Sequence, residues 1–142
     1  LAAVAESHPR FRPLEAALAP AAVHPAIFHG DFAPWNLRVH PDSRRWTVLD
    51  WERGELTGPP GWDWFHFVIQ SEILVRRAAP DVLVRRVEDL LASAAFCRYA
   101  ARAGIAACAR PLLISYLLYS LEVLRPVEGA KETCALLDAF DS

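Results

Sequence analysis

The sequence changes pattern at Pro59-Pro60-Gly61, and this change constrains the fold more than any other feature of the chain. From residue 26 to residue 56, short β-type runs alternate with turn-forming residues. From Gly61 to the end, apolar residues recur at the helical period. The pattern predicts an α+β fold that is mostly α, in which a helical bundle carries a small β insertion near its beginning.

The β part is predicted to be a hairpin that follows the end of another strand. That strand end covers 26–28 and leads into a loop at 29–35. The apolar runs 37–39 and 46–49 flank the turn-rich segment 40–45, an arrangement typical of a hairpin with a long loop.

Four helices are predicted after the β part, at about 62–77, 81–102, 111–124 and 130–140. The third is apolar nearly all round, so we expect it to be buried in the middle of the bundle. The alanine-rich segment 1–22 is broken by prolines and predicts one or two short helical turns.

Composition and charge favour a single globular domain without a nucleic-acid or membrane partner. The chain has 142 residues, 54% of them hydrophobic, and a net charge of -2, which gives no basic surface for nucleic acid. Its most apolar run, 112–124, is shorter than the roughly 20 residues that span a bilayer. Three cysteines are too few and too odd in number for a disulfide framework. We therefore expect a cytoplasmic protein whose cysteines are small buried residues on helices: Cys97, Cys108 and Cys134.

Two short segments carry most of the chemistry: His-Gly-Asp-Phe-Ala-Pro-Trp-Asn at 29–36 and Val-Leu-Asp-Trp-Glu at 48–52. They lie at the open end of the predicted hairpin. If Val39 pairs with Trp46, antiparallel counting places Asn36 opposite Leu49, next to Asp50. The hairpin is therefore expected to bring the two segments together.

Asp31 precedes Asn36 by five residues, on a loop that returns to the same point. Two carboxylates and an amide oxygen, from Asp31, Asp50 and Asn36, are thus expected to converge. Hard cations such as Mg²⁺ take one or two such oxygen ligands and complete their shell with phosphate and water. A carboxylate left off the metal can accept a proton from an incoming hydroxyl, so the set suits phosphoryl transfer.

These segments resemble the catalytic loop and the metal loop of the aminoglycoside phosphotransferase and choline kinase-like family, small-molecule relatives of the protein kinases. The pattern His-Gly-Asp-x-x-x-x-Asn, followed a hairpin later by Leu-Asp-Trp-Glu, carries the resemblance. Protein kinases have Arg in place of Gly30 and Phe-Gly in place of Trp51-Glu52. Both departures, and also Pro34, match the small-molecule branch.

The resemblance implies a kinase-like C-terminal lobe, a helical bundle whose small β-hairpin carries the catalytic and metal loops. Asp31 would be the catalytic base that orients the acceptor hydroxyl. Asn36 and Asp50 would hold Mg²⁺ on the phosphates of ATP or another nucleoside triphosphate. His29 and Asp63 would brace the catalytic loop, since Asp63 resembles the family's aspartate that opens the next helix.

The family also implies an N-terminal lobe, which supplies a phosphate-covering loop and a strand lysine for the nucleotide. The chain contains one lysine, Lys131, and no methionine, and 28 residues precede His29. We therefore expect 1–142 to be the C-terminal lobe of a longer protein, with little catalysis on its own. Apolar surface at the place where the N-terminal lobe would dock would be exposed in this chain and would favour an artificial oligomer.

Some of these residues also have a plainer interpretation. Asp63 suits the first turn of a helix whatever its other role. Glu52 is either near the metal, in a supporting position, or solvated. The tryptophans between Trp35 and Trp64 suit an aromatic cage for a quaternary ammonium, but packing around the β insertion is favoured. The histidines other than His29 show no metal-ligand spacing and are expected on the surface or in helix packing: His8, His24, His40 and His66.

The sequence thus predicts an ATP-dependent phosphotransferase that acts on a hydroxyl of a small molecule. The acceptor would be an aminoglycoside, an amino alcohol of the choline or ethanolamine type, or a sugar. Its pocket is expected between the catalytic loop and the helices beyond residue 61. The alternative is a catalytically inactive kinase-like module that acts as a scaffold or a nucleotide sensor.

Overall fold

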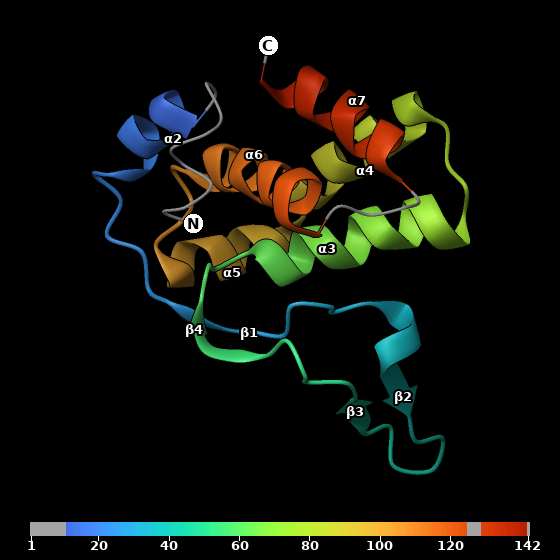
Figure 1. Cartoon of the computed structure of the whole chain (residues 1–142). Coiled ribbons are helices and arrows are strands. Elements are labelled where there is room, and N and C mark those ends of the chain that lie inside the picture. Colours follow the sequence, from blue (N-terminus) through green and yellow to red (C-terminus); the bar gives the residue numbers. More distant parts are fainter. Residues whose placement is uncertain (1–10, 125–128, 142) are drawn as a thin grey trace.

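The structure is a computed structural model that describes residues 11–124 and 129–141 (Figure 1). The described helices are α2 (Phe11–Leu18), α3 (Trp62–Gln70), α4 (Pro80–Ala92), α5 (Ala94–Ala103), α6 (Ala109–Tyr119) and α7 (Ala130–Phe140). The π-helical turns η2 (Ser71–Val75) and η3 (Ser120–Leu124) continue α3 and α6. The strands are β1 (Ala26–Phe28), β2 (Leu37–Val39), β3 (Trp46–Val48) and β4 (Glu55–Gly58), and the 3-10 turn η1 (Pro34–Asn36) precedes β2. The fold is α+β and mostly helical, as the sequence predicts.

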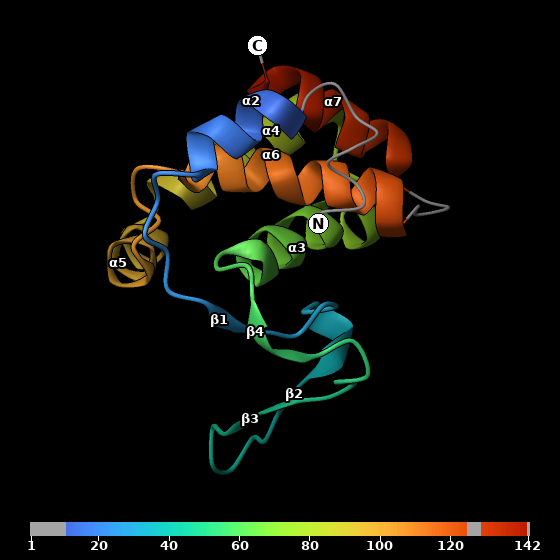
Figure 2. The same ribbon diagram turned by 60° about the vertical axis from the view of Figure 1, so that its left-hand side comes forward.

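Helix α6 lies at the centre of the helical layer. Both views show α3 between α6 and the β segments, and α2 and α7 on the opposite side of α6 (Figures 1 and 2). Every residue of α6 from 112 to 118 is buried, which confirms the expectation of a buried helix. The core joins the layers through fully buried side chains such as Phe65 of α3, Leu117 of α6 and Leu136 of α7. Helix α3 is therefore held rigidly behind the β part.

The β part consists of two antiparallel pairs, β1 with β4 and β2 with β3. In the β2–β3 hairpin, Leu37 lies opposite Val48 and Val39 opposite Trp46, so the predicted register is confirmed. Strand β4 was not predicted as a separate strand. It folds back on β1, with Phe28 opposite Glu55. This pairing closes the loop that follows β3 against the start of the segment 29–36, the candidate catalytic segment.

The predicted helix at 81–102 is wrong as a single element, because Ser93 divides it into α4 and α5. Ser93 has an extended backbone, with φ −65° and ψ 140°. Its side chain accepts a hydrogen bond from the Phe96 backbone N–H at 3.1 Å and so caps the new helix. The apolar period continues through the break, which is why the pattern does not reveal it.

The other helix predictions agree with the structure to within a few residues. α3 with η2 covers the predicted 62–77 except for its last two residues, and Pro111 lies in the first turn of α6. Helix α2 gives the short helical turns expected in 1–22, of which residues 1–10 lie outside the described residues. Throughout 11–124 and 129–141, every helix is too short or too polar to cross a membrane.

Two packing predictions are only partly correct. Trp62 is buried and Trp64 packs on Phe96 and Tyr99, but the other three tryptophans, all in the β part, are exposed: Trp35, Trp46 and Trp51. Among the cysteines, Cys108 is buried, whereas Cys97 and Cys134 are exposed on the solvent sides of α5 and α7.

Candidate functional site

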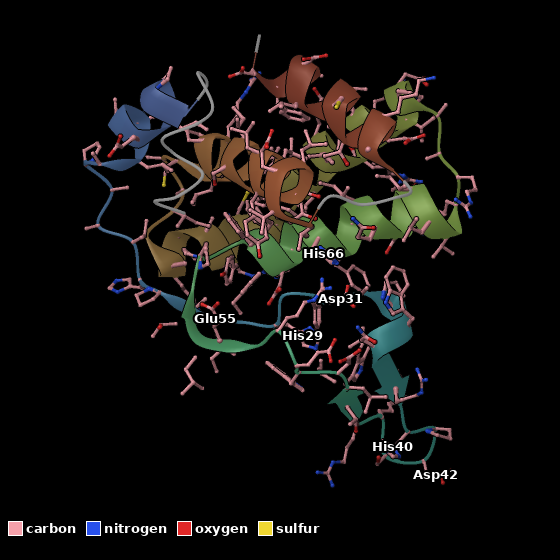
Figure 3. All side chains as sticks on the ribbon, viewed as in Figure 1. His29, Asp31, His40, Asp42, Glu55 and His66 are labelled. Carbon is pink, nitrogen blue, oxygen red and sulfur yellow. The ribbon has the colours of Figure 1, made fainter. Side chains whose placement is uncertain are left out.

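The segment 29–36 runs between β1 and β2 and faces the N-terminal half of α3 (Figure 3). The hairpin continues one step beyond β3, because the Leu49 N–H donates to the Asn36 carbonyl oxygen at 2.8 Å. This hydrogen bond places Leu49 against Asn36 and brings the start of the 50–52 segment to the end of the 29–36 segment, as antiparallel counting predicts.

Asp31 is held through both oxygens of its carboxylate. Oδ1 lies 3.0 Å from Nε2 of His66, and Oδ2 accepts from the side-chain amide of Asn36 at 3.0 Å. The same amide nitrogen donates to the Asp31 backbone oxygen at 2.9 Å. Asn36 is buried and the side chain of Asp31 is 30% exposed, so the carboxylate is fixed in orientation while one side remains open to a ligand.

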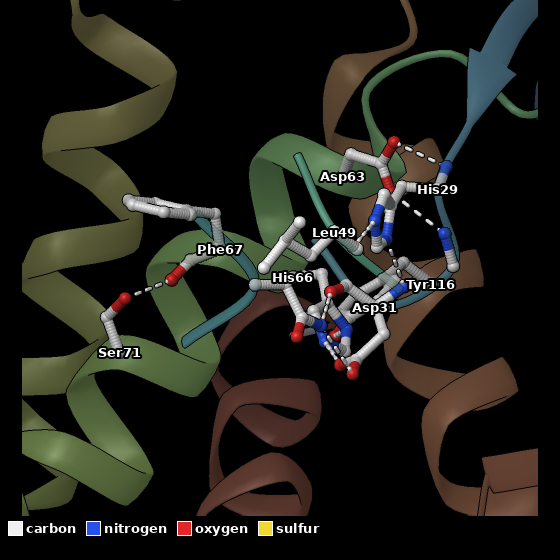
Figure 4. A network of polar contacts seen from close by, with 10 residues as sticks. His29, Asp31, Leu49, Asp63, His66, Phe67, Ser71 and Tyr116 are labelled. Atoms are coloured by element: carbon white, nitrogen blue, oxygen red, sulfur yellow. Dashed lines mark hydrogen bonds and ion pairs between the residues drawn. The ribbon is translucent and has the colours of Figure 1, made fainter. Parts of the chain in front are cut away.

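Asp63 joins the first turn of α3 to the catalytic segment. Its carboxylate accepts from the backbone N–H groups of His29, at 2.8 Å, and Gly30, at 3.3 Å (Figure 4). The same side chain lies in the first helical turn, where the helix dipole favours a negative charge. The two interpretations of Asp63 therefore coexist in one residue.

His29 is buried at the centre of the network, and its contacts define its tautomer. The Asp31 backbone N–H donates to Nδ1 at 3.2 Å, so Nδ1 carries no proton. Nε2 then carries the proton and donates it to the Leu49 carbonyl oxygen at 2.8 Å. His29 thereby links the catalytic segment to the residue that precedes Asp50.

Glycine is required at position 30 because Arg53, which follows the 50–52 segment, approaches it closely. Its φ is +83°, a left-handed conformation, and a Cβ built on it would lie 2.8 Å from Cβ and 2.9 Å from the carbonyl oxygen of Arg53. The protein-kinase arginine at this position would not fit here, which explains the departure noted in the sequence.

His66 and Tyr116 belong to the site, and the sequence analysis missed both. Nδ1 of His66 lies 3.0 Å from the Tyr116 hydroxyl, while Nε2 contacts Asp31 (Figure 4). His66 does pack between helices, as expected, but its contact with Asp31 was not predicted. A signal was present, because His66 follows Asp63 by three residues and so shares its face of α3.

Burial controls the protonation of this pair. Desolvation lowers the pKa of His66 from its usual 6.5, against the opposing effect of the hydrogen bond to Asp31. Complete burial raises the pKa of Tyr116 well above its usual value. Near pH 7 the phenol therefore stays protonated and donates to Nδ1, and the neutral imidazole donates from Nε2 to the Asp31 carboxylate.

The remaining predicted site residues are exposed. Asp50 follows Leu49 and has a left-handed backbone, with φ 60°, and both Asp50 and Glu52 face solvent. Within 11–124 and 129–141, no three His, Cys, Asp or Glu side chains are grouped closely enough to hold a metal ion. A metal at this site would thus depend on Asn36, Asp50 and ligands supplied by the nucleotide.

Two cavities of about 450 Å³ each adjoin the catalytic segment and α3. The first is largely apolar and includes Phe32, Trp46, Trp64 and Phe67 in its lining. The second extends from Pro34 and Phe67 along η2 to α4, and its lining includes Glu72 and Arg86. Glu72 is almost fully buried and forms ion pairs with Arg76 and Arg86. The lining of the second cavity therefore carries both negative and positive side chains.

Comparison with known proteins identifies a family through the same part of the chain. Searches of curated proteins and of solved structures gave no match. The family model described as the phosphotransferase enzyme family, APH, matches residues 2–69. The match includes both motif segments and Asp63, and it confirms the resemblance that the motifs carry. Residues 2–69 are thus similar to the phosphotransferase enzyme family.

Proposed function

We propose that this chain is the C-terminal lobe of an ATP-dependent phosphotransferase that moves the γ-phosphoryl group to a hydroxyl of a small molecule. The acceptor would be an aminoglycoside, an amino alcohol of the choline or ethanolamine type, or a sugar. One observation carries the proposal: the Asp31 carboxylate is fixed by two hydrogen bonds beside Asn36, in a segment of the phosphotransferase family.

Asp31 is proposed as the catalytic base. Each carboxylate oxygen has two lone pairs and uses one of them on His66 or Asn36, so a lone pair remains for an acceptor hydroxyl. A base held in this way orients the hydroxyl oxygen toward the phosphorus and takes its proton as the new bond forms. Phosphoryl transfer depends mainly on such positioning and on charge neutralisation.

Asn36 and Asp50 are proposed as the protein ligands of Mg²⁺. Asn36 uses its amide nitrogen for both contacts with Asp31, which leaves the side-chain oxygen for a cation. Asp50 contributes an exposed carboxylate just beyond Leu49, whose N–H is bonded to Asn36. Both donors are oxygens, so they fit a hard cation, and bound Mg²⁺ would neutralise the phosphate charge of ATP.

The acceptor pocket is proposed at the cavity that runs from Pro34 along η2 to α4. It adjoins the loop that carries Asp31, and its lining combines the apolar surface of Phe67 with the charges of Glu72 and Arg86. A small polar molecule with an amino group and a hydroxyl is the class that such a lining accommodates.

The nucleotide-binding lysine is proposed to come from an N-terminal lobe outside this chain. Lys131 is the single lysine of the sequence. It is exposed on α7, which lies on the far side of the helical layer from the catalytic segment (Figure 1). Lys131 is therefore unsuited to contact phosphates held at Asn36 and Asp50.

A screen of the complete two-lobed protein tests this function. The protein is incubated with Mg-ATP and, separately, kanamycin, choline, ethanolamine and glucose, and mass spectrometry detects the phosphorylated acceptor. We expect one class to be phosphorylated, Asp31→Ala to slow formation of the product by about 10²-fold or more, and Asp42→Ala, at an exposed hairpin position, to leave it unchanged. Binding of Mg-ATP without transfer to any of the four would support the inactive module instead.

A further inference from the structure

His66 lies at the junction of the catalytic segment and the buried core. It projects from α3 toward Asp31, whereas Tyr116 approaches it from α6, in the middle of the helical layer (Figure 4). His66 is 6% exposed and Tyr116 is 2% exposed. A continuous string of hydrogen bonds thus connects the carboxylate at the surface to the most deeply buried helix.

The direction of these hydrogen bonds follows from the chemistry of the three groups. The ionised Asp31 carboxylate can only accept, so Nε2 of His66 carries the proton and donates to it, and Nδ1 accepts from the Tyr116 phenol. If Nδ1 carried the proton instead, Nε2 would face Asp31 with a lone pair, and the two acceptors would repel each other. Tyr116 thereby supports the tautomer of His66 that the Asp31 carboxylate requires.

The packing around this string leaves the imidazole little freedom. Trp62, one turn earlier on α3, lies edge-on against the Tyr116 ring, with centroids 5.9 Å apart, and Phe65 packs on the same ring at 6.2 Å. The His66 ring is itself perpendicular to Tyr116, at an interplanar angle of 87°. A side chain locked in this way can fix the orientation of its partner.

We propose that His66, held in its Nε2–H tautomer between Asp31 and Tyr116, is a positioning residue that fixes the Asp31 carboxylate in the orientation needed to receive the acceptor proton. This inference rests on the proposed function. Asn36 donates to the other carboxylate oxygen from within the catalytic segment, whereas the contact from His66 comes from α3. Its contribution appears in the rate of transfer and not in the binding of nucleotide.

The kinetic test compares four variants of the complete protein, with Mg-ATP and the acceptor that gives the highest turnover in the screen. His66→Leu removes the donor and is expected to lower kcat by about tenfold or more, with the KM for ATP unchanged. His66→Gln places an amide N–H near the position of Nε2 and should restore part of the loss. Tyr116→Phe should lower kcat less than His66→Leu. Ile69→Val, an equally buried change on α3 at a side chain that makes no hydrogen bond, should lower the melting temperature but not kcat.

A spectroscopic test is independent of turnover. Long-range ¹H–¹⁵N correlation spectra of the histidine rings report which nitrogen carries the proton, and the His66→Gln variant assigns the signal. We expect the Nε2–H form of His66 in the protein, and the same form in Tyr116→Phe, because the Asp31 carboxylate can only accept. An Nδ1–H form in the unmodified protein would overturn the inference.

The outcomes separate this inference from the function on which it rests. If Asp31→Ala lowers kcat by about 10²-fold or more while His66→Leu retains full kcat, the positioning role is wrong and the phosphotransferase stands. If Asp31→Ala has no effect, the proposed base itself is wrong. In the supported case, adding His66→Leu to Asp31→Ala causes no further loss, because both act on the same step.

Discussion

Asp50 has two roles at the residue scale, and they favour different side chains. Its backbone is left-handed, with φ 60°, a conformation that suits glycine better than any L-residue. Its carboxylate is the proposed ligand of Mg²⁺. Glycine at this position would relieve the backbone strain but would remove the proposed ligand.

Replacement of Asp50 with glycine is therefore expected to separate the two roles. Asp50→Gly should stabilise the fold by up to about 1 kcal/mol, because the left-handed strain is relieved. It should also weaken the binding of Mg-ATP, because a metal ligand is lost. Arg44→Gly provides the matched control, since Arg44 is left-handed, with φ 51°, but lies in the hairpin turn. Calorimetry measures the affinity for Mg-ATP, and urea unfolding measures the stability. Equal affinity in the two variants would show that Asp50 is not a ligand of the metal.

His66 gives the stability of the protein a predictable dependence on pH. Its pKa is lowered by burial, so below its usual 6.5 the folded chain binds fewer protons than the unfolded chain. The contribution of the neutral imidazole to folding is complete above that value and is lost as the pH falls through the lower pKa of the folded state. Urea unfolding at about pH 7.5 and pH 5 should show this loss, and His66→Gln should reduce it. His24→Gln, at an exposed position, should leave the difference unchanged.

At the scale of elements, α3 organises the site because one of its faces carries both Asp63 and His66. Asp63 binds the backbone of the catalytic segment and His66 binds its carboxylate. Packing of α3 on α6 fixes this face, and the β pairs hold the segment against it. The geometry of the site thus depends on an element that begins about thirty residues after His29.

Asp63→Ala is expected to destabilise the fold by about 1–3 kcal/mol, because two backbone N–H groups lose their acceptor. The control is Asp81→Ala. Asp81 also lies in the first turn of a helix, but it is exposed and pairs with the exposed Arg85, so its loss should cost less than about 1 kcal/mol. Thermal unfolding of both variants measures the difference. Equal effects would mean that Asp63 acts through the helix dipole alone.

The sequence predicted the elements that local patterns determine and missed those that depend on distant partners. Turn residues and alternation at 37–48 were sufficient for the hairpin register, and the motif spacing located Asp31 beside Asn36. Strand β4 has weak β character of its own and forms because β1 is available to pair. His66 was missed because its partners, Asp31 and Tyr116, lie 35 and 50 residues away along the chain.

At the scale of the whole molecule, apolar side chains are exposed mainly on the β part. Leu56 is 86% exposed, Trp46 66% and Ile27 64%, and all three lie on strands. The helical layer, by contrast, buries most of its large apolar residues. Such a surface suits contact with another folded unit, which in the proposed protein is the N-terminal lobe.

The chain of 142 residues is therefore expected to self-associate when it is prepared alone. Leu56→Lys should shift the sedimentation profile toward the monomer, because it places a charge on the apolar surface. Val75→Lys is the control, since Val75 is 63% exposed on η2, away from the β part. If both variants sediment like the unmodified chain, the β surface does not drive association.

The central claim is that the Asp31 carboxylate serves the transfer step while Asn36 and Asp50 serve the metal–nucleotide complex. Steady-state kinetics of the complete protein, combined with Mg-ATP binding, tests this division most directly. Asp31→Ala should lower kcat by about 10²-fold or more with nucleotide affinity retained, and Asp50→Ala should raise the dissociation constant of Mg-ATP. Undiminished turnover in Asp31→Ala would contradict the account.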